Sequence, residues 1–271
     1  SKHSPGYMYV WDETIASRGS QEIAACLTKH IKQNPRKHII IYSDTCTGQN
    51  RNINLSMALM KLTQESGIDI IDQKFMVSGH SYLPNDADFG HIEQAAKNKT
   101  IYTPEDWYEA IISARKQNKF LLIKMQQDEI LSTSNLTKAI TNRKKDKDKN
   151  KVNWLKIQWL RYDKKREYFI LYKYTLDEDI PFQEIDLRPA KKGRRLSLAS
   201  IDQQRLYDSP RVMNDLKKRD MLYLLKYIPP VHHGFFRSLR SSRDVEDNGP
   251  LLDVDEVDPL LDGEEVVDED Q

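Results

Sequence analysis

Residues 38–52 read HIIIYSDTCTGQNRN, and this stretch decides the fold class of the chain. The run from His38 to Ser43 is short, apolar and rich in isoleucine, the pattern of a strand buried on both faces of a sheet. Asp44 follows directly, and the polar residues after it include Gly48, so a loop is expected there. A carboxylate at the carboxyl end of a buried strand lies at the rim of the sheet, where α/β proteins place their sites. The stretch therefore predicts an α/β fold with a functional loop at Asp44.

Strand and helix patterns alternate on both sides of this stretch. Residues 7–11 alternate as a strand does, and Ile23, Leu27 and Ile31 recur at a helical spacing. Downstream, the patterns predict a helix from Ile53 to before Gly67, a strand over 68–77, helices starting near Pro84 and Pro104, and a strand over 120–125. This alternation is typical of a layered α/β sheet.

The chain changes character after Met125. Residues 138–151 hold seven basic residues and almost nothing apolar, so we expect an exposed loop. Residues 155–159 and 168–174 suit the two strands of a hairpin, and Ser209-Pro210 opens a last helix that Pro229-Pro230 closes. These shifts predict three parts: a core over 1–125, a basic, β-containing extension over 126–236 and a tail over 237–271.

The net charge of +1 conceals a strong asymmetry. From Asp244 to Gln271 there are 13 acidic and no basic residues, so the first 243 residues carry 42 basic and 28 acidic residues, a balance of +14. A tail this acidic and poor in aromatic residues is predicted to be disordered. Its one local repeat is Pro250-Leu251-Leu252-Asp253, which returns as Pro259-Leu260-Leu261-Asp262. A basic body with an acidic tail predicts DNA as a partner, and protein partners through the tail are the second expectation.

Several features indicate where the protein works. Two cysteines, Cys26 and Cys46, do not form a disulfide framework, which indicates a reducing compartment. No segment has the length and hydropathy of a membrane span, and no secretory signal is evident, although the chain opens at Ser1. We therefore expect a nuclear or cytoplasmic protein that is not secreted and does not enter a membrane.

Two acidic clusters are the candidates for chemistry. Asp44, held rigidly at a strand end, suits a magnesium ligand beside a phosphate, although it could equally shape a turn and cap the next helix. The second cluster, residues 78–93, brings Asp86 and Glu93 into one strand-to-helix junction. They lie seven residues apart, about 10 Å along a helix, so only one of them can join Asp44 at a metal pair. The alternative for Asp86 is an acid that stabilises a helix N-terminus.

Residues 39–52 and 78–93, with residues 7–13, 16–23, 101–107 and 227–232, resemble a family of transposon-derived proteins common in arthropod genomes and known as a domain of unknown function. The resemblance covers about residues 7–236. It implies an RNase H-like fold with DDE- or DDD-type catalytic acids, which in transposases bind two magnesium or manganese ions and cut or join DNA. By this resemblance Asp44 is the second acid and Asp86 the third, with Glu93 in reserve.

One departure from that family bears on activity. The strand that carries the family's first acid would precede Ser1, and Asp12 lies on a different strand. We therefore expect an RNase H-like sheet without its first strand, and a nuclease-like domain that is inactive as it stands. The alternative is a non-enzymatic module that binds nucleic acid or protein. A remoter alternative is a phosphatase with an aspartate nucleophile, whose usual second acid is replaced by Cys46.

Two lysine- and arginine-rich clusters are the candidate phosphate contacts. They are Lys144, Lys145 and Lys147, and Lys192, Arg194 and Arg195. The alternative for both clusters is a solvated loop. The second cluster also resembles a nuclear localisation signal.

Overall fold

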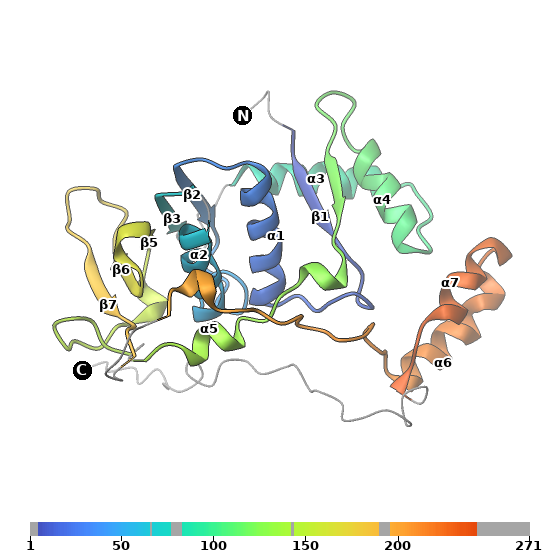
Figure 1. Ribbon diagram of the computed structural model, residues 1–271. Coiled ribbons are helices and arrows are strands. Elements are labelled where there is room, and N and C mark those ends of the chain that lie inside the picture. The colour runs from blue at the N-terminus through green and yellow to red at the C-terminus, as the bar shows by residue number, and fades with distance from the viewer. Residues whose placement is uncertain (1–4, 66, 77–82, 142–143, 190–195, 243–271) are drawn as a thin grey trace, which may run out of the picture.

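The computed structural model (Figure 1) describes residues 5–65, 67–76, 83–141, 144–189 and 196–242. The chain forms a mixed α/β structure, as the sequence predicts. In chain order its strands and its helices of five or more residues are β1 (Tyr7–Val10), α1 (Ser20–Gln33), β2 (His38–Ser43), α2 (Ile53–Glu65), β3 (Ile70–Phe75), α3 (Pro84–Ala96), α4 (Pro104–Ser113), β4 (Leu121–Lys124), α5 (Ser134–Lys138), β5 (Trp159–Asp163), β6 (Phe169–Lys173), β7 (Gln183–Asp186), α6 (Asp215–Leu224) and α7 (His233–Ser238).

The main sheet has five strands in the order β2-β3-β5-β6-β7. β2 and β3 are parallel, and the remaining neighbours are antiparallel. The predicted hairpin forms, but its first strand is β5 at Trp159–Asp163 and not residues 155–159, because Trp154–Lys156 is a short 3-10 helix. Strand β7 was not expected from the sequence. The sequence suggested a domain boundary between residues 125 and 126. β3 precedes that boundary and β5 follows it, yet the two strands pair in one sheet.

Helix α2 fills the centre of the core, between α1 and one face of this sheet (Figure 1). Ten of its 13 residues are buried, as expected for a helix that is covered by the rest of the protein on all sides. A buried hydroxyl in this core is paired: that of Tyr162 lies 3.0 Å from Ser56 Oγ and 3.1 Å from Gln73 Oε1. The buried Lys61 ammonium donates to the carbonyls of Leu198, Ala199 and Ile201, so it holds residues 198–201 over α2.

The prediction that residues 38–43 form a strand buried on both faces is wrong. β2 is an edge strand of the described sheet, and its residues alternate between partly buried and exposed. Ile40 and Tyr42 are 48% and 52% exposed on the face opposite α1 and α2. An isoleucine run looks the same in a central strand and in an edge strand with one covered face, so the sequence could not distinguish them.

β1 and β4 form a separate, parallel two-stranded sheet. The sequence predicted both strands, but it placed them in one layered sheet with the others. Instead they pack with α3 and α4 through Ile92, Ile111 and Phe120. Tyr7 and Tyr9 of β1 contact the ring of His30 on α1, which joins this small sheet to the main body.

The last described segment forms a helical pair, α6 and α7, beside α4 (Figure 1). Met213, Leu225, Phe236 and Leu239 make its core. α6 begins at Asp215, five residues after Pro210, because the Asn214 side chain accepts the amide of Leu216 and caps the helix there. Within the described residues, no helix has the length and apolar character needed to cross a bilayer. The acidic tail from residue 243 lies outside the described residues.

Candidate functional site

Asp44 lies where the sequence placed it, directly after a strand, and its carboxylate organises its own loop. Its Oδ1 accepts the amide of Cys46 at 3.1 Å and the side-chain amide of Asn50 at 2.6 Å. The next helix is capped instead by Asn52, whose side chain accepts the amide of Leu55 at 3.0 Å. Asp44 is therefore an exposed turn former with one oxygen engaged by the loop.

The other two predicted acids lie on α3. Asp86 occupies its first turn, where Oδ2 accepts the amide of Leu83 at 2.9 Å. Glu93 is exposed further along the same helix. His80, from the same cluster, lies outside the described residues. Among the residues that are described, no three histidine, cysteine or carboxylate side chains come together in a group that could hold a metal ion. The metal site of Asp44 and Asp86 thus stays a prediction.

The first basic cluster forms a compact turn, residues 144–151, which we call the lysine turn. Lys145 and Lys151 face each other in an antiparallel bridge, and Lys144, Lys147 and Lys149 are exposed with them. The prediction of an exposed loop over 138–151 is wrong at three points: Lys138 ends α5, Ile140 is buried in the main core, and Asp146 at the centre of the turn is only 4% exposed.

Asp146 fixes the shape of the lysine turn. Its two carboxylate oxygens accept the backbone amide of Asn150 at 2.7 Å and the Asn150 side-chain amide at 3.1 Å. The Tyr172 hydroxyl on β6 approaches the same carboxylate at 3.4 Å. Burial, and then the neighbouring Tyr174 and Asp146, raise the pKa of Tyr172, so this phenol stays protonated and can donate. The lysines are therefore carried on a backbone that the sheet holds in place.

One lysine of the turn is partly neutralised and another is strained. Lys147 lies 3.7 Å from Glu184 on β7, and that glutamate also pairs with Arg166. Lys149 has a φ of 69°, the left-handed region that glycine adopts at no steric cost. The second basic cluster, with Lys192, Arg194 and Arg195, lies outside the described residues.

The sheet face opposite the helices carries an ionic network that no local sequence pattern predicts. Asp72 on β3 is 1% exposed and accepts Arg161 Nε at 2.7 Å, Trp159 Nε1 at 2.7 Å and His38 Nε2 at 2.7 Å. Burial alone would favour the neutral acid, but the hydrogen bonds from these three partners hold the pKa of Asp72 below its ordinary value. Because every oxygen of Asp72 is engaged, we assign this network to structure.

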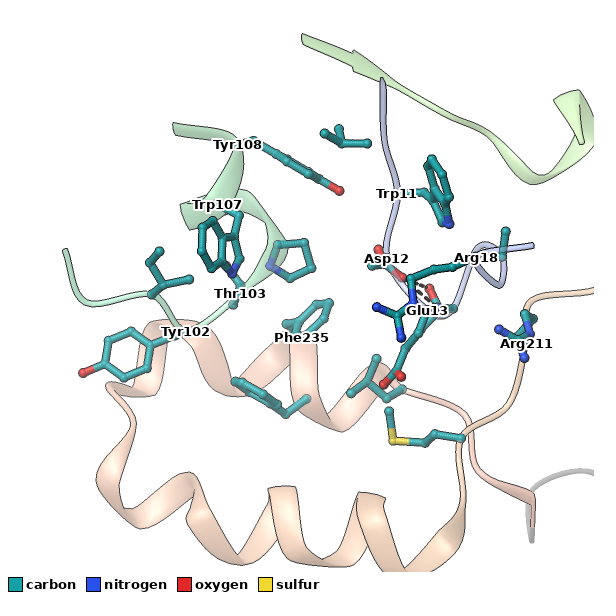
Figure 2. Close-up of a pocket in the computed structure, with 18 of the residues that line it drawn as sticks. Trp11, Asp12, Glu13, Arg18, Tyr102, Thr103, Trp107, Tyr108, Arg211 and Phe235 are labelled. Atoms are coloured by element: carbon teal, nitrogen blue, oxygen red, sulfur yellow. Dashed lines mark hydrogen bonds between the residues drawn. The ribbon is translucent and has the colours of Figure 1, made fainter. Parts of the chain in front are cut away.

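A cavity of about 790 Å³ lies between three parts of the chain that are distant in sequence. Its walls are the loop from β1 to α1, the start of α4, and the helical pair α6 and α7 (Figure 2). Seven aromatic side chains line it: Tyr9, Trp11, Tyr102, Trp107, Tyr108, Phe235 and Phe236. We call this cavity the aromatic pocket.

Four charged side chains meet at the aromatic pocket, and Figure 2 shows Arg18 and Arg211 on the side away from Trp107. Asp12 accepts the amide of Thr14 at 2.8 Å and its hydroxyl at 2.5 Å. Burial, and then the nearby charge of Asp12, raise the pKa of Tyr108. No sequence pattern identified this pocket, because its three walls meet only in the folded chain.

No protein-family model, curated protein or solved structure matches this chain.

Proposed function

We propose that this chain is a DNA-binding α/β domain of the RNase H-like, transposase-derived type, which holds DNA through the lysine turn without cutting it. The observation that carries the proposal is the presentation of five lysines on one anchored turn of eight residues. Asp148 is the only exposed acid within that turn. A duplex carries a phosphate charge about every 1.7 Å along its axis, so clustered ammonium groups suit it well.

The lysine turn has two energetically unfavourable features, and these support the proposal that it binds an anionic ligand. Like charges directly opposite each other across two strands destabilise the pairing, and Lys145 lies opposite Lys151. A non-glycine residue in the left-handed region is disfavoured by about 1 kcal/mol, and Lys149 occupies that region. Of these two costs, a bound polyanion would offset the repulsion between the lysines.

The resemblance also implies magnesium or manganese, held by Asp44 and Asp86. As the two residues lie here, Asp44 holds its own loop and Asp86 caps α3. Two-metal catalysis requires ions about 4 Å apart, bridged by shared carboxylates, and the described residues do not assemble such a ligand set. We therefore derive no step through a metal ion, and the proposal is limited to binding.

The test compares two triple variants of the full chain. Lys144→Gln, Lys145→Gln and Lys149→Gln remove three charges from the lysine turn. Lys97→Gln, Lys116→Gln and Lys119→Gln remove three exposed charges from the α3 and α4 region. Fluorescence anisotropy with a labelled duplex, over a series of salt concentrations, gives the affinity and its salt dependence.

We expect the lysine-turn triple to weaken DNA binding at least about tenfold at low salt and to lower the logarithmic salt slope by about 2 to 3 units. The α3–α4 triple should change both quantities little. Equal losses in the two triples would mean that only the overall charge attracts DNA. Cleavage of the duplex in magnesium or manganese, lost in Asp44→Asn, would overturn the limit to binding.

A further inference from the structure

The aromatic pocket has the features of a ligand site that its own chain leaves open. Its volume, about 790 Å³, falls within the range of small-ligand and peptide sites. Trp107 lines it and remains 45% exposed, although a tryptophan gains more than most residues from burial. A concave apolar surface of this kind indicates a binding partner.

The charges around the pocket define the ligand. Glu13 is paired with the Lys217 ammonium at 2.6 Å, and Asp12 is satisfied by Thr14. Within the described residues, Arg18 and Arg211 take part in no ion pair with a carboxylate. Figure 2 shows Tyr102, Trp107 and Phe235 on one side of the pocket, and Arg18 and Arg211 on the other, together with Trp11, Asp12 and Glu13. The complement of the pocket is a short segment with adjacent aliphatic and acidic side chains.

The chain carries such a segment twice after Ser242, and Ser242 itself lies beside the pocket. The Ser242 amide donates to the carbonyl of Met213 at 3.0 Å, and Met213 lines the pocket. Nine residues lead from Ser242 to Leu251, and an extended chain of that length reaches about 30 Å. Pro250-Leu251-Leu252-Asp253 therefore has both the reach and the chemistry to enter.

We propose that the aromatic pocket binds the Pro-Leu-Leu-Asp segment of the chain's own acidic tail. Leu251 and Leu252 occupy the side away from the arginines, and Asp253 pairs with Arg18 and Arg211. The second copy, residues 259–262, presents the same side chains and substitutes for the first. The inference is independent of DNA binding, because the lysine turn contributes nothing to the pocket.

The experiment uses full-length variants and the tryptophans as reporters. Trp11 and Trp107, two of the four tryptophans, line the pocket. One variant changes Leu251, Leu252, Leu260 and Leu261 to Ser and so alters both repeats. The matched control changes Val254, Val257, Val266 and Val267 to Ser, which removes as many aliphatic side chains from the same tail. Tryptophan emission and its quenching by acrylamide are then measured.

We expect a red-shifted emission and stronger quenching in the leucine variant, and neither change in the valine control. Replacing Trp107 with Phe in both chains should remove most of the difference. A synthetic peptide of residues 248–264 should then restore the emission of the leucine variant saturably. In the leucine variant, Arg211→Gln should weaken this peptide about tenfold, the usual effect of losing one charge-assisted hydrogen bond.

Two results would overturn the proposal. If the leucine and valine variants have the same emission and quenching, and the peptide does not bind, the pocket does not recognise this segment. If they have the same emission but the peptide binds in trans, the natural occupant is a similar segment of another protein and not the tail of this chain.

Discussion

The Asp44 loop and the lysine turn are built with the same local chemistry. In each, an aspartate accepts a backbone amide and the side-chain amide of an asparagine further along, Asn50 in one case and Asn150 in the other. The difference is burial, because Asp44 is exposed and Asp146 is 4% exposed beneath Tyr172. A buried aspartate fixes the backbone that presents other side chains, whereas an exposed one remains accessible to solvent and ligand.

Asp72 extends the comparison to complete burial. It lies within a strand, and its partners come from two neighbouring strands of the sheet, β2 and β5. The three aspartates therefore form a series in which the contribution to stability should rise with burial and the availability for ligands should fall.

The largest effect is expected for Asp72→Ala. Removing one partner of a buried ion pair leaves the other uncompensated, and this costs about 3 kcal/mol here, since the Arg161 side chain keeps 24% exposure. Urea unfolding gives the free energy. The nearby exposed Asp69→Ala is the control and should stay within about 0.5 kcal/mol of the wild type. Equal effects in the two variants would contradict the structural role of Asp72.

The lowered pKa of Asp72 also sets the direction in which the free energy of unfolding changes with pH. Because the pKa of Asp72 is lowered on folding, its contribution is complete above the unfolded value of about 3.9 and is lost as the pH falls through the lower folded value. The free energy of unfolding should therefore fall less steeply with acid in Asp72→Asn than in the wild type below about pH 4. Parallel acid limbs would contradict this.

The second effect in size is expected for Asp146→Ala. The change leaves the Asn150 side chain and the Tyr172 hydroxyl without their acceptor, which should cost about 2 kcal/mol in unfolding free energy. It should also release the lysine turn and weaken DNA binding although the positive charge rises. Asp148→Ala, an exposed acid in the same turn, adds the same charge and should leave stability nearly unchanged. If both variants bind DNA more tightly, charge matters and the shape of the turn does not.

The series also shows what the sequence could and could not predict. Strand β2, helix α2 and the starts of α3 and α4 were predictable because apolar periodicity and capping are local features. The burial of Asp72 and Asp146 was not, because each depends on strands that are distant along the chain. For the same reason the sequence missed the edge position of β2, the separate pairing of β1 with β4, and the three-walled aromatic pocket. Asp44 was found because strand-end acids leave a local signature, but the signature does not reveal whether a second acid lies beside it.

A smaller effect, with opposite signs in two measurements, is expected for Lys149→Gly. Glycine accepts the φ of 69° without strain, so the variant should be about 0.5 to 1 kcal/mol more stable to urea. It should also bind DNA more weakly and lose about one unit of salt slope, because one ammonium is gone. Lys147→Gly, at the neighbouring exposed lysine without such a φ, should lose stability instead. A loss of stability in Lys149→Gly would mean that the turn holds no strain at that residue.

The smallest effect is expected for Asp44→Asn. The variant keeps an oxygen that can accept the Cys46 and Asn50 amides, and the side chain is exposed, so the free energy of unfolding should change by no more than about 0.5 kcal/mol. Its use lies in a second measurement, the thermal midpoint with and without manganese. A ligand that binds only the folded state stabilises it by about 1.4 kcal/mol at a ligand concentration of tenfold the dissociation constant. This stabilisation raises the thermal midpoint. Because Asp44 is not joined by other ligands among the described residues, we expect wild type and variant to respond to manganese alike. A rise in the wild type that Asp44→Asn lacks would identify Asp44 as a metal ligand, and would contradict the view that its carboxylate only shapes the loop.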